Sequence, residues 1–139
     1  MNGIAIVCNG DGISHNEENA VKTSFYPFEG HHSLCIKNSF LFSTDNFFSD
    51  RSIEEDDDIC VLINGYITNV DEILEILGDK SNSNLPINIL LAKLYRRFGE
   101  ESIVHIKGAF SLIIYDGEKN KIIAAKDHMS MKPLYYAQT

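Results

Sequence analysis

The sequence predicts an α+β fold in which helices pack on antiparallel β-sheets. Apolar, β-rich runs lie near both ends of the chain, and two segments with helical spacing follow one another directly between them. Strands and helices therefore do not alternate as βαβ units, which would build a parallel sheet. The length of 139 residues is that of one domain, and 44% hydrophobic residues are sufficient for a buried core.

The first half of the chain gives the weaker signals. Gly3 to Cys8 is an uninterrupted apolar run, which predicts a strand in the centre of a sheet with Cys8 buried. Short apolar pieces at residues 33–36 and 40–42 stand among polar residues and predict no definite element. Five consecutive acidic residues at positions 54–58 predict a solvated loop.

The signals become stronger from Ile59 onward. Ile59–Ile63 is a short, continuous apolar run, which is typical of a strand covered on both faces. Asn69 and Glu72 then have the spacing of a capping box, and Gly78 follows the last position of a helical pattern. The apolar positions of this first predicted helix are Val70, Ile73, Leu74 and Leu77.

A second helix is predicted between Pro86 and Gly99, because proline is typical of a helix start and glycine of a helix end. Its apolar face carries Ile87, Leu90, Leu91, Leu94 and Phe98. Residues 109–115 and 121–125 are β-rich and flank a polar turn, so they predict a β-hairpin. Pro133–Tyr136 predicts one more strand.

Composition excludes several classes of function. The formal net charge is −8, and the adjacent basic pair Arg96-Arg97 lies inside the second predicted helix, so nucleic acid is not an expected partner. The apolar runs are too short to span a membrane, and the N-terminus lacks the basic region of a signal peptide. The three cysteines show no paired spacing, which favours reduced thiols in the cytoplasm. His31-His32 follows Gly30 and is expected to lie in a surface turn, so no metal site is predicted.

Four segments of the chain together resemble a known family. They are Met1–Ala5, Leu62–Asn69, Leu94–Gly99 and Ile106–Tyr136, and they occur in the order and at the spacing found in class II glutamine amidotransferases. In the last segment, I-K-G-A-F-S-L-I-I-Y-D is followed by A-K-D-H-M-S-M-K-P-L-Y-Y. The chain is therefore similar to the N-terminal glutamine amidotransferase domain of asparagine-synthetase-like proteins, and the likeness covers most of residues 59–136.

The resemblance implies a more specific fold than the apolar pattern does. The family has an Ntn-hydrolase-like sandwich of two antiparallel β-sheets with helices packed on the outside. Residues 1–139 are expected to form a single glutamine-amidotransferase-like domain. Family domains continue with further strands after the segment that matches Pro133–Tyr136, so a truncation on the C-terminal side is expected. A second copy of the chain or a synthetase would then cover the exposed edge near Tyr135-Tyr136.

The resemblance also implies the position of the family's nucleophile. In the family, a cysteine with a free α-amine attacks the carboxamide of glutamine. This position falls on Asn2, whose side chain has no lone pair basic enough for such an attack. Met1 is expected to remain in place before asparagine and to block the α-amine.

Of two further sites of the family, this chain has the residues of one and lacks those of the other. The asparagine side chain and glycine N–H that stabilise the oxyanion fall on Asn64 and Gly65, which are both present. By itself this pair would be typical of a tight turn, and a turn that also forms an oxyanion hole is expected here. The aspartate that binds the substrate ammonium falls on Ile87, and the arginine for its carboxylate has no counterpart in residues 31–50.

These losses predict a catalytically degenerate glutamine amidotransferase-like domain. It would serve an asparagine-synthetase-like, ATP-dependent amide-forming system in a structural or regulatory role. The alternative is a free-standing binding module that has kept the fold, and a third hypothesis is an active glutamine-hydrolysing domain. The chain has no phosphate-binding loop, so no cofactor is expected in it, and ATP and Mg would require a synthetase domain or partner.

Overall fold

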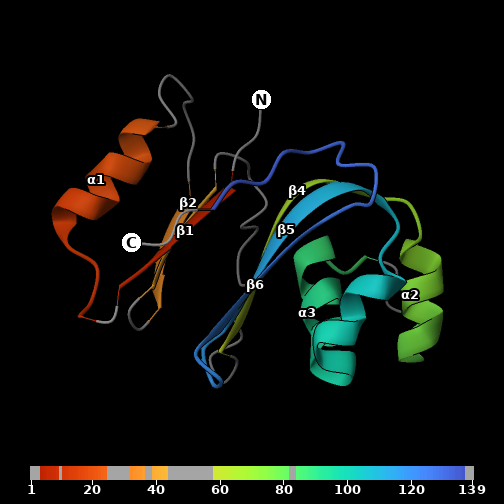
Figure 1. Cartoon of the computed structure of the whole chain (residues 1–139). Helices are drawn as coiled ribbons and strands as arrows, with labels where there is room; N and C mark the ends of the chain where they lie inside the picture. The colour runs from red at the N-terminus through yellow and green to blue at the C-terminus, as the bar shows by residue number, and fades with distance from the viewer. Residues whose placement is uncertain are drawn as a thin grey trace. The chain divides into compact units, whose positions relative to one another are not determined.

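The computed structural model describes residues 4–9, 11–24, 32–36, 39–43, 58–81 and 84–136 (Figure 1). These residues fall into two compact units, Met1–Arg51 and Ser52–Thr139. Each unit contains helix and an antiparallel sheet of three strands. The mixed α+β class that the sequence predicts is therefore confirmed.

The first unit contains strand β1 (Ile4–Cys8), helix α1 (His15–Ser24), strand β2 (His32–Ile36) and strand β3 (Ser39–Ser43). Strand β3 lies in the middle and pairs antiparallel with both β1 and β2. The prediction that β1 is a central strand is wrong for the described sheet, in which β1 lies at an edge. Cys8 at its end is exposed, so its predicted burial is also wrong. An apolar run does not reveal on which sides a strand is paired, because pairing depends on distant segments.

Helix α1 was not predicted, although the sequence contains its start signal. The backbone N–H of Ser14 donates to the Glu17 carboxylate at 2.8 Å, and its hydroxyl donates to the same carboxylate at 2.7 Å. The Glu17 backbone N–H returns a hydrogen bond to the Ser14 hydroxyl at 3.3 Å. This is a capping box, and it satisfies N–H groups that the first turn of a helix leaves without a partner.

The second unit is larger and carries the segments on which the family resemblance rests. Its elements are β4 (Ile59–Ile67), α2 (Val70–Leu77), α3 (Ile87–Phe98), a 3₁₀ segment η1 (Gly99–His105), β5 (Gly108–Asp116) and β6 (Lys121–Lys126). The strands form an antiparallel sheet in the order β4-β5-β6. Helices α2 and α3 lie on the same side of this sheet (Figure 1). The two helices and the hairpin are confirmed close to their predicted limits.

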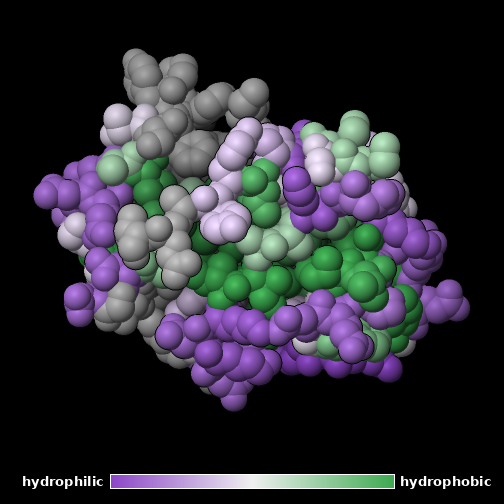
Figure 2. Space-filling view, viewed as in Figure 1, coloured by the Kyte–Doolittle hydropathy of each residue, from purple (hydrophilic) through white to green (hydrophobic). Residues whose placement is uncertain are grey.

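The core of this unit lies between the helices and the sheet. Alternate residues of β4 and β5 face the helices, and the cluster consists of Val61, Ile63, Ile73, Leu74, Leu90, Leu91, Leu94, Tyr95, Ile106, Phe110, Leu112 and Ile114. Figure 2 shows hydrophobic side chains (green) gathered over the β4–β6 sheet and α3. Strand β6 covers the core incompletely, since Ile123 and Ala125 are only partly buried.

The last predicted strand, Pro133–Tyr136, does not form. These residues have no regular secondary structure, and the side chains of Tyr135 and Tyr136 are 89% and 92% exposed. A strand needs a neighbour with which to share hydrogen bonds, and none of the described strands pairs with this segment. No helix in the described ranges has the length and apolar character needed to cross a membrane.

Candidate functional site

Asn64 and Gly65 lie within a strand and not in a turn. Strand β4 continues through both residues to Ile67, with Asn64 opposite Ser111 and Gly65 opposite Phe110 on β5. The expectation of a turn at this position is therefore wrong. Long-range pairing with β5 outweighs the local turn preference of the Asn-Gly pair, because nine consecutive residues of β4 find partners on β5.

Two glycines in the paired strands β4 and β5 leave no room for a side chain at this place. Gly65 has a φ of +125°, and a Cβ atom added to it would overlap the carbonyl oxygen of Ala109. Gly108 has a φ of +152°, and its added Cβ would overlap the carbonyl oxygen of Tyr66. Only glycine fits such positions without strain. The two glycines thus fix the backbone around the position implied for the oxyanion hole.

Of the implied site residues that the structure describes, Asn64 and Ile87 do not lie on one face of the sheet. Ile63 belongs to the core cluster, so the side chain of the next residue, Asn64, points to the opposite face of the sheet. Ile87 begins α3 and packs against the core cluster on the helix side. Asn2 lies outside the described residues.

Asn69 connects the end of β4 to the chain that enters β5. Its side-chain amide donates to the carbonyl of His105 at 2.8 Å, and its side-chain oxygen accepts from the backbone N–H of Lys107 at 2.9 Å. Its amide also contacts the Glu72 carboxylate at 3.3 Å, but no side-chain cap bond reaches the helix backbone. The predicted capping box is therefore wrong. Asn69 is the N-cap residue of α2, but its side chain binds the backbone of His105 and Lys107 in place of the helix backbone.

Asp127 lies directly after β6 and binds the backbone of β5, and it was not predicted as a site residue. Its buried carboxylate accepts backbone N–H groups from Phe110 at 3.2 Å, Met129 at 2.9 Å and Met131 at 3.1 Å. Burial by itself would raise the pKa of Asp127, but these backbone hydrogen bonds outweigh it and the pKa is lowered. Since Phe110 is opposite Gly65, Asp127 supports the strand that faces the oxyanion-like segment.

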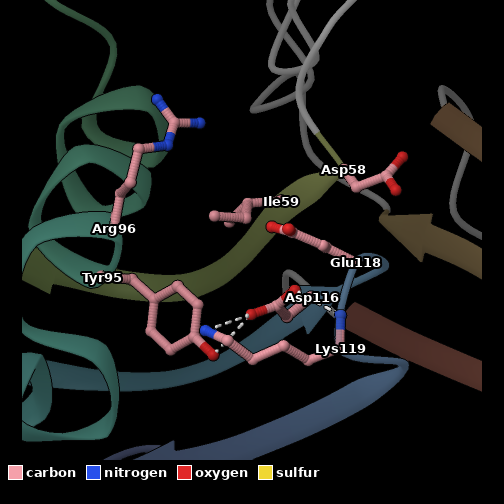
Figure 3. Close-up of a pocket in the computed structure, with 7 residues that line it drawn as sticks. All are labelled: Asp58, Ile59, Tyr95, Arg96, Asp116, Glu118 and Lys119. Carbon is pink, nitrogen blue, oxygen red and sulfur yellow. Dashed lines mark hydrogen bonds and ion pairs between the residues drawn. The ribbon is translucent and has the colours of Figure 1, made fainter.

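A second polar cluster lies at the opposite end of β5 (Figure 3). The buried Asp116 carboxylate accepts the Tyr95 hydroxyl at 2.9 Å and the Lys119 backbone N–H at 3.0 Å, and it pairs with the Lys119 ammonium at 3.1 Å. Burial would raise the pKa of Asp116, yet the hydrogen bonds from Lys119 and Tyr95 outweigh it and the pKa is lowered. Burial and the bond to Asp116 raise the pKa of Tyr95 to about 12.

This cluster gives a prediction on stability and pH. The folded protein binds the Asp116 proton more weakly than the unfolded chain, so the stabilisation is complete at neutral pH and is lost as pH falls below about 4. Asp116→Asn should reduce the free energy of unfolding by about 1.5–3 kcal/mol at pH 7. The difference from wild type should shrink in acid. Urea unfolding at several pH values measures this difference. Glu118→Gln is the control, because Glu118 is exposed and lies two residues from Asp116. An equal effect of Asp116→Asn at pH 7 and pH 3 would contradict this assignment.

No metal site is evident in the described ranges, since no three His, Cys, Asp or Glu side chains converge there. The candidate site therefore consists of the Asn64-Gly65 segment and the residues that hold it. Asn69, Gly108 and Asp127 were missed as supporting residues. All three residues lie in segments that carry the family resemblance, which is the signal that could have indicated them.

Comparison with known proteins identifies the family. A family model described as "Glutamine amidotransferase domain" matches residues 48–139. The chain is 31% identical over 86 residues to asparagine synthetase [glutamine-hydrolyzing] 2 of Bacillus subtilis (strain 168), which covers 62% of this chain and 12% of that protein. It is 31% identical over 107 residues to asparagine synthetase [glutamine-hydrolyzing] of Sandersonia aurantiaca, covering 76% of this chain and 20% of that protein.

A third relative carries a different name. Amidase chry2 of Gibberella zeae is 31% identical over 85 residues, which is 60% of this chain and 12% of that protein. The matches thus span a fifth or less of the length of these three relatives. The family match covers well over half of this chain and implies an Ntn-like fold. The strands and helices of the second unit fall inside the matched residues. The chain belongs to the glutamine amidotransferase domain family and is related to the asparagine synthetases at about 30% identity.

Proposed function

We propose that this chain is a glutamine amidotransferase-like domain without glutaminase activity, which serves an ATP-dependent, amide-forming system of the asparagine-synthetase kind. The observation that carries the proposal is Asn2, which stands at the position of the family's cysteine nucleophile. The amide nitrogen of asparagine is not basic, so it cannot attack a carboxamide as a thiolate does. The role that remains for the domain is structural or regulatory.

The identity of residue 87 supports the loss of substrate binding. Ile87 stands where the resemblance implies the aspartate that pairs with the substrate ammonium. An apolar side chain cannot pair with the ammonium group of glutamine. A charge that is buried without a partner costs several kcal/mol, so glutamine would bind weakly even with a nucleophile present.

Exposed side chains support a protein partner. Four large apolar side chains lie within eight residues of one another and are well exposed: Met129 (69%), Met131 (63%), Tyr135 (89%) and Tyr136 (92%). The Asp127 carboxylate holds the turn that presents the two methionines. We propose that a synthetase domain or partner protein, or a second copy of the chain, covers this surface, and that ATP and Mg are bound by the synthetase.

A glutamine-hydrolysis assay tests the proposal. The purified chain should release no ammonia or glutamate from glutamine above the uncatalysed background. The relative from Bacillus subtilis, whose name describes it as glutamine-hydrolyzing, serves as the positive control under the same conditions. Sustained turnover by the wild-type chain would overturn the degenerate assignment and favour the active-glutaminase hypothesis.

A second candidate function is a free-standing binding module. The observation that favours it is a polar cavity of about 400 Å³ beside Asp116, which is of a size that a small ligand could occupy. Purification from the native host separates the two functions. A synthetase identified by mass spectrometry in a stoichiometric complex supports the first, whereas a chain isolated without one supports the second.

A further inference from the structure

We propose that strand β6 pairs antiparallel with β6 of a second copy of the chain, which joins the two three-stranded sheets into one continuous sheet. Strand β6 pairs with β5 on one side, and none of the described strands pairs with its other side (Figure 1). This edge is separate from the exposed methionines and tyrosines described above. The inference does not depend on whether glutaminase activity has been lost.

Alternate residues of β6 direct their backbone groups toward the free edge. The Asp127 N–H donates to the Phe110 carbonyl at 3.0 Å, so the backbone of residue 127 points toward β5. In an antiparallel ladder this direction alternates from one residue to the next. The register of β6 on β5 continues without a bulge along the whole strand. The N–H and C=O groups of Ile122 and Ala124 therefore point away from β5, where a further strand can bind them.

The side chains of β6 make this edge apolar. Ile122 is 41% exposed, and Ala124 is also exposed. Ile123 and Ala125 pack against the core on the helix side, but they are only partly buried. Four consecutive apolar residues thus lie at an edge of the sheet, with one lysine before them and one after them. Such an edge is a template for pairing with another strand.

One register of a two-fold pair satisfies the backbone groups. With Ile123 opposite the same residue of the second copy, Ile122 of each strand lies opposite Ala124 of the other. The outward N–H and C=O groups of these residues can then form hydrogen bonds in both pairs. The two Ile123 side chains adjoin on the helix side and extend the partly covered cores of both copies.

The same register also suits the charges, which is why we commit to a second copy as the partner. Each Lys121 lies opposite Ala125, so no two lysines oppose each other. A shift by two residues in either direction would place a lysine opposite an isoleucine. A shift by one residue would place outward backbone groups opposite inward ones, and the hydrogen bonds would be lost.

The pairing is short, so the dimer should be weak. A standard protein interface buries about 1,200–2,000 Å², and a pair of six-residue strands buries less. The net charge of −8 on each chain adds repulsion that salt screens. We expect a Kd on the order of 0.1 mM, with stronger association at higher ionic strength.

Sedimentation equilibrium from about 10 μM to 1 mM measures this association. Ala124→Pro should weaken it by about tenfold or more, because proline removes an outward N–H and leaves the hydrogen bonds to β5 in place. Its melting temperature should stay within a few degrees of wild type. Ala124→Val is the matched control, since it keeps the N–H and should dimerise at least as well.

A cross-link tests the register. Ile123→Cys should form a disulfide between two copies, because the opposed residues have Cα atoms roughly 4.5 Å apart in the proposed pair. Tandem mass spectrometry identifies the peptide that contains residue 123 linked to its own copy. Tyr135→Ser should leave the dimer unchanged, since Tyr135 lies outside β6. A monomer at every concentration would overturn the proposal, as would a dimer that Ala124→Pro leaves intact.

Discussion

Asn2→Cys is expected to leave the protein without measurable glutaminase activity. The substitution supplies a thiol, and a small second residue favours removal of Met1, so that the α-amine would also become free. The substrate site would still be incomplete, because Ile87 offers no partner to the ammonium of glutamine. An uncompensated buried charge costs about 3–5 kcal/mol, which lowers occupancy by roughly two to three orders of magnitude. Ammonia release from glutamine measures the result.

The double variant Asn2→Cys, Ile87→Asp distinguishes the effect of restoring the nucleophile from the effect of restoring substrate binding. Intact mass spectrometry must first show that Met1 has been removed, and thermal unfolding must show that both variants fold. Activity that appears only in the double variant would support the roles assigned to positions 2 and 87. Robust turnover by Asn2→Cys alone would show that Ile87 does not occupy the position of the substrate-binding aspartate.

Gly65→Ala is expected to destabilise the protein more than any other single exchange considered above. At a φ of +125° an L-residue is strained, and the new Cβ would overlap the Ala109 carbonyl in the middle of the β4–β5 ladder. Neither strand can shift without breaking the hydrogen bonds beside the overlap. The expected loss in the free energy of unfolding is at least about 3 kcal/mol, a large part of the 5–15 kcal/mol typical of a domain.

Gly78→Ala is the matched control for this exchange. Gly78 also has a positive φ, +73°, but no atom lies within 4 Å of an added Cβ. Gly78→Ala should therefore lower the free energy of unfolding by about 1 kcal/mol, which is the cost of the left-handed conformation alone. Urea unfolding of the two variants compares them directly. Equal losses would contradict the expected overlap between a Cβ atom at position 65 and the Ala109 carbonyl.

Several elements of the fold can be predicted from local sequence signals. Helix α2 ends at Gly78, whose left-handed conformation closes the last turn, and α3 lies between Pro86 and Gly99 as predicted. The β5–β6 hairpin follows from two β-rich runs separated by a polar turn. Helix α1 also has a local signal, the Ser-x-x-Glu spacing of Ser14 and Glu17, which form a capping box. This helix could therefore have been predicted from the sequence. In each case the deciding contacts join residues within a few positions of one another.

Features that depend on distant partners cannot be predicted from local sequence signals. The Asn64-Gly65 pair has the local preference of a turn, but pairing with β5 keeps it in a strand. Asn69 has the spacing of a capping box, but its side chain is used by His105 and Lys107. Strand β1 has the apolar character of a central strand and lies at an edge of the described sheet. Hydrogen bonds and packing between residues far apart in sequence outweigh local preferences worth about 1 kcal/mol or less, and no local pattern encodes them.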